Sequence, residues 1–391
     1  MAGMTSPNRS TYDVIVIGAG SIGAPTALYL SRAGFRTLVI DSRSSPGQGS
    51  NKAAIGGVRA THSDPAKVRL CLRSLDIFSN WKETWGDDIE WNKGGYVFVA
   101  YRPREEQTLK ELLEVQHSLG LNIHWLDRDG LLGVVPDLNP EGLLGGTYSP
   151  EDGSVSPLLF AHACCRHAQR FGAEFRFNET VTDLVVEGGR ITAVVTDRGR
   201  YACLNALLAA GAWAQPLAQI AGMYLPVNPD SHEAAITEPV ARFLNPMVVD
   251  IRPAPGSANY YFYQHATGQI IFCITPSPNI WGCDCRETST FLPMVARRMV
   301  DLMPRLSNVR VRRTWRGLYP MTPDGFPLIG WSQEVRGLLV AAGMCGQGLM
   351  LGPGVAELLV RMLQYRQSEE DKQILQILSP YREFAGQEKL K

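Results

Sequence analysis

The stretch Asp13-Val14-Ile15-Val16-Ile17-Gly18-Ala19-Gly20-Ser21-Ile22-Gly23 decides the fold of this chain. A near-continuous run of apolar β-forming residues leads directly into the spacing Gly-x-Gly-x-x-Gly. The residues from Ala24 to Ala33 predict a helix that ends at Gly34, and 36–40 predict a second buried strand that ends in Asp41. A strand, glycine turn, helix, strand and acidic residue in this order are typical of a dinucleotide-binding βαβ unit.

Each of these residue types has a physical role in such a unit. Gly18 permits a tight turn, Gly20 lets a pyrophosphate approach the backbone, and Gly23 lets the helix pack closely on the strand. The phosphates meet free N–H groups at the start of the helix, and Asp41 can accept hydrogen bonds from a ribose. The unit predicts a dinucleotide site but does not identify the dinucleotide.

The composition is that of a globular protein without a preference for nucleic acid. The chain has 391 residues, enough for two domains, and 45% of them are hydrophobic and 19% charged. Lys and Arg together number 38, as do Asp and Glu, so there is no net charge that would attract nucleic acid. We therefore expect a small-molecule substrate and no nucleic-acid partner.

The sequence predicts neither a membrane span nor a metal site. The segment from Met1 to Thr11 is polar and lacks the apolar run of a signal peptide, and no stretch approaches 18 apolar residues. The eight cysteines lack the spacing of a zinc site, and several lie in apolar runs. Reduced thiols and a cytoplasmic location are expected.

The order of predicted elements indicates two interleaved domains. The segment 44–57 is predicted to be a flexible polar loop. Helices are expected over 66–85, 105–119, 158–171, 291–303 and 353–364. Strands are expected over 96–100, 174–177, 181–186, 191–196, 204–210, 232–237, 259–264, 269–275, 309–317 and 338–342. Blocks of mixed α/β pattern thus alternate with β-rich blocks.

The carboxy-terminal part repeats the arrangement of the first βαβ unit. The apolar strand 338–342 runs into Gly343-Met344-Cys345-Gly346-Gln347-Gly348, and Pro353 suits the first turn of the following helix. Free N–H groups and a helix start there could stabilise negative charge on a reduced cofactor. Taken alone, the same pattern is equally typical of a plain strand-to-helix turn.

Together these features resemble the family of FAD-dependent amine and amino-acid oxidoreductases typified by D-amino-acid oxidase. The branch of monomeric sarcosine oxidase, glycine oxidase and the β subunits of sarcosine oxidase and proline dehydrogenase is most similar. The resemblance spans nearly the whole chain and rests on an ordered series of motifs: Gly18 to Gly23, Asp41, Gly49-Ser50, Gly56-Gly57-Val58-Arg59, Asp152-Gly153, Ala210-Gly211-Ala212-Trp213, Thr322-Pro323-Asp324, and Ala341-Ala342-Gly343 with Gly346 and Gly348.

The resemblance implies an α/β fold. A Rossmann-like FAD-binding domain (1–90, 151–225 and 317–391) would be interleaved with a β-rich, α+β substrate domain (91–150 and 226–316). It also implies FAD rather than NAD, and oxidation of a C–N bond by hydride transfer to flavin N5, which gives an imine.

Carried over position by position, the resemblance assigns a cofactor site. The residues expected to contact FAD are Gly18, Ala19, Gly20, Ser21, Ile22, Gly23, Asp41, Ser42, Arg43, Ser50, Asn51, Lys52, Val181, Gly211, Trp213, Gly343, Gly346, Gln347, Gly348, Leu349 and Met350. In this assignment the first glycine turn holds the pyrophosphate, and the turn before the last helix faces the pyrimidine end of the flavin. Backbone N–H groups there would stabilise the anionic charge of the reduced ring.

The substrate residues implied by the resemblance are fewer. Arg59 lies where related enzymes bind the substrate carboxylate, and its guanidinium could form a bidentate pair with that group. Tyr319 occupies a position that faces the substrate, and Tyr261, or its neighbour Tyr260, would enter from the β-rich domain. Aromatic residues of this kind can equally belong to the core. His232 could line the cavity but carries no prediction of a role.

Three departures from the family pattern bear on the chemistry. Gly317 replaces the cysteine that tethers the flavin in monomeric sarcosine oxidase, so FAD is expected to be non-covalent. Met350 replaces a second carboxylate-binding cation. No lysine occurs between Lys110 and Lys372, so the lysine that promotes oxygen reduction is missing and a dehydrogenase is favoured over an oxidase.

The sequence therefore predicts FAD-dependent oxidation of a small amino acid or secondary amine of sarcosine, glycine, proline or opine type. Two alternatives stay open. One is a flavin-binding scaffold or assembly factor without catalysis, and the other is an enzyme subunit that passes electrons through a partner. The amine, the electron acceptor and the oligomeric state are not predicted.

Overall fold

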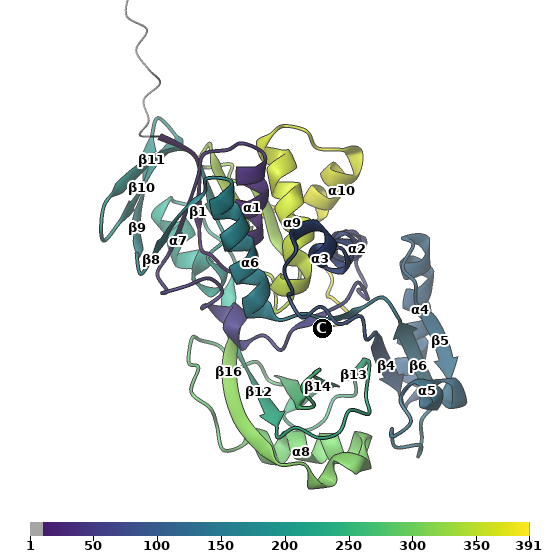
Figure 1. Cartoon of the computed structure of the whole chain (residues 1–391). Helices are drawn as coiled ribbons and strands as arrows, with labels where there is room; N and C mark the ends of the chain where they lie inside the picture. Colours follow the sequence, from purple (N-terminus) through teal and green to yellow (C-terminus); the bar gives the residue numbers. More distant parts are fainter. Residues whose placement is uncertain (1–10, 391) are drawn as a thin grey trace, which may run out of the picture.

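The computed structural model describes residues 11–390 and arranges them around two large β-sheets (Figure 1). The prediction that there is no signal peptide rests on the segment 1–11. Almost all of this segment lies outside the described residues. Within residues 11–390, no helix is both long enough and apolar enough to cross a membrane.

The first sheet is built on the predicted βαβ unit. Its strand order is β17 (Leu328–Trp331), β18 (Leu338–Ala342), β11 (Arg200–Leu208), β1 (Thr11–Ile17), β2 (Thr37–Asp41) and β8 (Glu174–Phe177). The strands from β18 to β8 run parallel, β17 is antiparallel at the edge, and the hairpin of β9 (Val181–Glu187) and β10 (Arg190–Thr196) extends β11. The carboxyl ends of β1, β2, β11 and β18 therefore meet at one edge, where ligands bind in open parallel sheets.

Helices cover both faces of this sheet. Successive residues of a strand point to opposite faces, and here both sets of side chains are apolar and need to be buried. Val14 and Val16 of β1 pack with α1 (Gly23–Arg32), α2 (Pro65–Ser79), α6 (Pro157–Arg170) and α9 (Gly348–Leu363). Ile15 and Ile17 pack on the other face with α7 (Ala214–Ile220). The near-continuous hydrophobicity of the strand is thus explained by burial on both sides.

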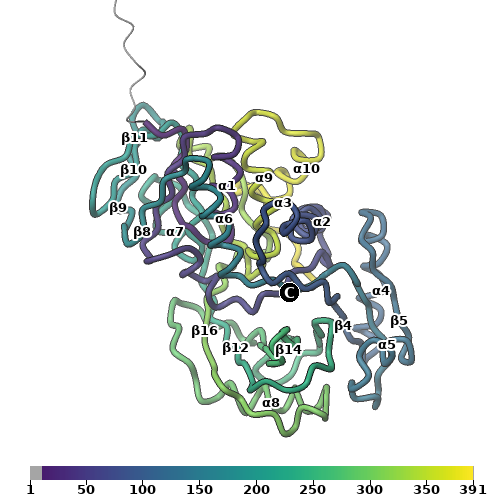
Figure 2. Tube along the Cα trace, viewed as in Figure 1, coloured from purple at the N-terminus to yellow at the C-terminus, as the bar shows by residue number. Residues whose placement is uncertain are grey.

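The second sheet is mainly antiparallel. Its strand order is β16 (Val311–Met321), β12 (Asn228–Thr237), β15 (Ile270–Pro276), β14 (Ser257–Gln264), β13 (Met247–Asp250), β4 (Tyr96–Ala100), β6 (Gly145–Ser149) and β5 (His124–Asp127). One of its faces packs on α8 (Phe291–Leu302) and α5 (Arg128–Val134). Tyr96 and Phe98 on the opposite face pack with α4 (Pro103–Ser118) and with Leu390 near the chain end. Figure 2 shows that this end of the chain lies where the two halves of the molecule meet.

The remaining elements connect the two sheets or flank them. They are β3 (Gly57–Val58), β7 (Gly153–Ser154), α3 (Trp81–Trp85), α10 (Glu369–Ile377) and the 3₁₀ turns η1 (Ser50–Ala53), η2 (Gly211–Trp213) and η3 (Pro304–Asn308). The mixed α/β architecture confirms the predicted fold class. The strands of the second sheet come from 96–149 and 228–321, and β16 runs past residue 316. We keep the two-domain division as a proposal, with β16 crossing its boundary.

Three expectations about local structure were wrong. The helix 66–85 is two helices, because the Asn80 backbone leaves helical geometry and its side-chain amide donates to both the carbonyl and the carboxylate of Asp76. The last large helix begins at Gly348 and includes Pro353 in its interior. The loop 44–57 contains η1 and the buried Asn51, whose amide donates to the Pro157 carbonyl at 2.9 Å, so part of it belongs to the core.

Candidate functional site

A cavity of about 530 Å³ lies between the carboxyl edge of the first sheet and one face of the second. This size falls in the range of small-molecule and cofactor sites. Of the predicted site residues, the following line it: Gly18, Gly20, Ser21, Ile22, Asp41, Ser42, Arg43, Ser50, Asn51, Arg59, Val181, Gly211, Trp213, Tyr261, Tyr319, Gly346, Gln347, Gly348, Leu349 and Met350. Ala19, Gly23, Lys52 and Gly343 do not line it.

The first glycine turn has the geometry that its sequence predicts. Gly18 has φ +105°, and a Cβ there would lie 2.5 Å from the Ala209 carbonyl oxygen. A Cβ on Gly23 would meet the Gly18 carbonyl, so this glycine serves packing rather than ligand contact. A Cβ on Gly20 would meet nothing within 4 Å, since that face opens into the cavity. The three glycines therefore divide into a turn, an approach surface and a packing contact, as expected for a pyrophosphate site.

The acidic residue at the end of β2 is held at the same edge. The Asp41 carboxylate accepts from the backbone N–H groups of Ala19, at 2.7 Å, and Arg43, at 2.8 Å. Burial raises the pKa of Asp41, although both backbone donors act against this. The guanidinium of Arg43 lies 5.5 Å from the centre of the Trp213 ring, so two predicted residues meet here. This end of the cavity offers an aromatic face, a cation and a carboxylate.

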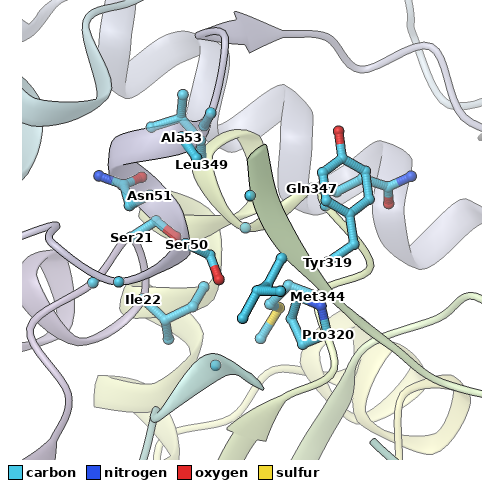
Figure 3. Close-up of a pocket in the computed structure, with 18 of the residues that line it drawn as sticks. Ser21, Ile22, Ser50, Asn51, Ala53, Tyr319, Pro320, Met344, Gln347 and Leu349 are labelled. Atoms are coloured by element: carbon cyan, nitrogen blue, oxygen red, sulfur yellow. The ribbon is translucent and has the colours of Figure 1, made fainter. Parts of the chain in front are cut away.

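A second turn enters the cavity between β18 and α9. Figure 3 labels Met344 and Gln347 of this turn. In that view Ser21, Ser50 and Asn51 lie on one side of the pocket, and Tyr319 and Gln347 lie on the other. The side-chain oxygens of Ser50 and Gln347 are buried without a hydrogen-bond partner among residues 11–390. Buried polar atoms are rarely left unpaired. Both line the cavity, so a polar ligand there would satisfy them.

Gly346 shows how tightly this turn packs. It has φ +80°, and a Cβ there would lie 2.2 Å from Cε2 of Tyr319. Gly343 has φ +65°, and its Cβ would meet Thr322. Gly343 therefore serves the turn rather than the cavity. Sequence spacing could not separate these two roles.

The face of the second sheet that borders the cavity follows from strand register. On adjacent strands, Ala234 pairs with Cys273, Cys273 pairs with Tyr261, and Tyr261 pairs with Val249. All four line the cavity. Tyr260 points to the opposite face and packs with α8, so Tyr261 is the cavity residue of the pair. The hydroxyl groups of Tyr261 and Tyr319 lie 2.7 Å apart and share a hydrogen bond.

His232 is a cavity residue to which the sequence assigned no role. Its ring stacks on Tyr319 with centres 3.7 Å apart and an angle of 16° between the rings. Its Nε2 lies 3.0 Å from the buried Asp230 carboxylate. Burial lowers the pKa of His232, and this outweighs the opposite effect of Asp230. The alternation of Asp230 and His232 on one face of a strand could have indicated this pair.

Arg59 lines the cavity but is already engaged by the protein. Its guanidinium donates to the Thr61 carbonyl and, at 2.5 Å, to the Leu390 carbonyl. It also lies 5.3 Å from the centre of the Phe98 ring. The contact with Leu390 joins residues far apart in the sequence, and no local pattern predicted it. A substrate carboxylate would have to share Arg59 with the carboxy-terminal segment.

Two departures noted in the sequence fall inside this site. A Cβ on Gly317 would lie 2.5 Å from Cβ of Ala53, so no side chain fits at the position of the flavin-tethering cysteine without a shift. Met350 lines the cavity on α9. Among residues 11–390, the lining includes arginine and histidine but no lysine.

The comparison with protein families identifies the chain. Residues 13–362 match the family model DAO, FAD dependent oxidoreductase. The chain belongs to this family. The match confirms the resemblance seen in the sequence, and FAD is the cofactor of the family.

Individual relatives span the same region of the chain. Hydrogen cyanide synthase subunit HcnC of Pseudomonas aeruginosa is 28% identical over 90% of this chain and 92% of its own length. Glycine oxidase of Geobacillus kaustophilus is 26% identical over 92% and 95%. Mitochondrial sarcosine dehydrogenase of Mus musculus is 25% identical over 94% of this chain, which spans only 41% of that protein.

A solved structure extends the likeness to the fold. L-proline dehydrogenase from P. horikoshii has a TM-score of 0.89, is 28% identical and aligns over 95% of this chain and 98% of its own. The geometry of the site residues also fits FAD, independently of these comparisons. The opening at Gly20 suits a pyrophosphate, Asp41 suits a ribose, and the unpaired Ser50 and Gln347 oxygens suit the polar parts of the cofactor.

Proposed function

We propose that this protein oxidises the C–N bond of a small amino acid or secondary amine that carries a carboxylate. The observation that carries the proposal is a single cavity that joins the glycine turn of one sheet to Tyr261, Tyr319 and His232 of the other, with Arg59 on its wall. Relatives named for glycine, sarcosine and proline support substrates of this size and type.

In this proposal each side chain has a defined task. FAD, bound non-covalently at the two glycine turns, supplies a two-electron acceptor that takes hydride from the carbon next to nitrogen. Arg59 binds the carboxylate, since a guanidinium suits that group in both charge and shape. Tyr319 and Tyr261 border the substrate with a shared hydroxyl pair. Val249, Ala234 and Phe98 keep water away from the reacting carbon. The imine product hydrolyses in water.

We further propose a dehydrogenase that passes electrons to an acceptor other than oxygen. No lysine lines the cavity within residues 11–390, and the position between Ala234 and Tyr261 in the strand register holds Cys273. Burial raises the pKa of the Cys273 thiol, so it is neutral and supplies no positive charge. Without a cation at this position, the face of the second sheet gives little stabilisation to a developing oxygen anion.

Anaerobic mixing tests the proposal. A panel of sarcosine, glycine, proline and N-carboxymethyl amino acids is added to the purified flavoprotein under argon, and at least one is expected to bleach the visible flavin absorbance. An artificial dye should then reoxidise the flavin much faster than air does. Failure of every amine to bleach the flavin would refute the proposed reaction, and fast reoxidation by air would refute the dehydrogenase.

One observation favours a second candidate, a flavoprotein scaffold without catalysis. The Arg59 guanidinium is occupied by two backbone carbonyls, Thr61 and Leu390, in place of a substrate carboxylate. A scaffold would bind FAD yet show no bleaching with any amine. The name of the relative HcnC as a subunit also supports a search for a co-purifying partner. A partner that accelerates reoxidation would assign the chain to an electron-transferring complex.

A further inference from the structure

Beside Tyr319, the cavity holds a histidine whose hydrogen-bonding state is largely fixed by its surroundings. His232 is only 6% exposed, and Asp230, two residues earlier on the same face of β12, is fully buried. The Asp230 carboxylate also accepts from the Asn279 amide at 2.6 Å and from the Ile280 N–H at 2.7 Å. Burial alone would raise the pKa of Asp230, but the hydrogen bond from His232, together with those from Asn279 and Ile280, holds this pKa below its ordinary value. An ionised Asp230 requires a proton on Nε2 of His232.

The other ring nitrogen of His232 is left as an acceptor. A neutral imidazole with its proton on Nε2 carries a lone pair on Nδ1. This Nδ1 is buried and has no hydrogen-bond partner among the described residues, although His232 lines the cavity. An unpaired buried acceptor costs free energy unless a ligand satisfies it. Stacking on Tyr319 places it beside a residue at which the substrate is expected.

We propose that Nδ1 of His232 accepts a hydrogen bond, and then a proton, from the ammonium group of the substrate. This inference rests on the proposed function and adds the residue that prepares the amine for oxidation. The substrate N–H bond breaks and its electron pair stays on nitrogen, while the proton forms an N–H bond on Nδ1. The resulting imidazolium donates through Nε2 to the Asp230 carboxylate, which stabilises its charge. The proton leaves to solvent after the product departs.

The surrounding groups are compatible with this transfer. The ionisable groups near His232 are Asp230 on its own strand, Tyr319 and Arg316 on β16, Tyr261 on β14, Cys273 on β15, and Glu233, which accepts from Thr288. Burial raises the pKa of Tyr319, Tyr261 and Cys273, so these three stay neutral near pH 7. His232 is then the neutral base of this wall.

The test compares two variants of His232 that carry a side-chain amide. In one the amide lies near the position of Nε2, and in the other it lies near the position of Nδ1. His232→Gln can keep a donor toward Asp230 but loses the Nδ1 acceptor, whereas His232→Asn can keep an oxygen near Nδ1. His124→Gln on the exposed edge strand β5 is the matched control. Flavin content and thermal stability are measured first, and Asp230→Asn serves as a second test if His232→Gln fails to fold.

The decisive readout is the pH profile of anaerobic flavin reduction by the amine that reduces the wild-type protein fastest. His232→Gln is expected to lower the rate roughly 100-fold at pH 7, in the range of a general base. The rate should approach that of wild type as the pH nears the pKa of the free amine, about 10. His232→Asn should lie between the two, and His124→Gln should match wild type. An equal loss at every pH, or no loss, would overturn the proposal.

A second readout is independent of turnover. The dithionite-reduced holoprotein is titrated at pH 7 with sarcosine and with butanoate, which has the same shape without nitrogen. Wild type should bind sarcosine at least tenfold more tightly than butanoate, and His232→Gln should lose this preference. An unchanged preference in the variant would count against His232. If no amine reduces the wild-type flavin, the proposed reaction itself has failed, which is a different result.

Discussion

The carboxy-terminal segment is anchored by a buried ion pair, and breaking this pair should loosen the segment. Lys67 is fully buried, and its ammonium group donates to the Glu388 carboxylate at 3.0 Å and to the Gly325 carbonyl at 2.8 Å. Glu388 also accepts from the hydroxyl of Ser63 at 2.6 Å. Glu388→Gln would leave the Lys67 charge without its counterion. Removal of one partner from a buried pair costs about 3–5 kcal/mol.

The assay is thermal and urea unfolding of the FAD-loaded protein. The midpoint temperature of Glu388→Gln should fall by roughly 4–6 °C. Glu383→Gln, on the same segment but exposed, is the control and should change little. A loss of less than about 1 kcal/mol in Glu388→Gln would refute the reasoning, because exposed pairs are worth that little.

The same pair predicts a dependence on pH. Burial alone would raise the pKa of Glu388, but Lys67 and the Ser63 hydroxyl outweigh it and hold the pKa well below its ordinary value. A lowered pKa means that the stabilisation is present above about pH 4.3, the ordinary value for Glu, and is lost as the pH falls toward the folded-state value. The difference between wild type and Glu388→Gln should therefore shrink progressively as the pH falls below about 4.3.

Two further variants test the site itself. Arg59→Ala should raise the KM for carboxylate-bearing amines roughly 10- to 100-fold, since a charged hydrogen bond is worth about 1.5–3 kcal/mol, with unchanged flavin content; equal KM values would remove Arg59 from the site. Gly346→Ala should lower the free energy of unfolding by about 1–3 kcal/mol, because the added Cβ meets the Tyr319 ring. It should also lower the flavin content of the purified protein. Gly120→Ala has the same backbone strain, with φ +79° and no atom within 4 Å, so equal losses in both variants would show that the ring contact is unimportant.

Local sequence patterns predicted the parts of this protein that depend on local physics. The βαβ unit follows from its continuous apolar runs, from Gly18, whose positive φ few other residues adopt easily, and from Gly23, which leaves no room for a side chain. Local patterns did not predict strands whose formation depends on pairing with neighbouring strands of the sheet. The strand β6 (Gly145–Ser149) has the sequence GGTYS and looks like a turn, yet it is held between β4 and β5. The helix α10 was missed although Ser368 and Asp371 form a capping box at its start.

The site divides in the same way. The glycine turns and Asp41 were predictable because each belongs to one short segment with its own conformational demand. His232 was not, since its meaning comes from Tyr319 on the neighbouring strand and from Asp230. Nor was the contact of Arg59 with Leu390, which depends on where the chain end packs.

A crystal structure of the purified protein with its flavin tests the central claim most directly. We predict one FAD in the cavity between the two sheets, with its ribose at Asp41 and its pyrophosphate over Gly20. Its isoalloxazine ring should lie between the 346–349 turn and the face that carries Tyr319. A protein without flavin, or a flavin bound elsewhere with this cavity filled only by water, would contradict the account.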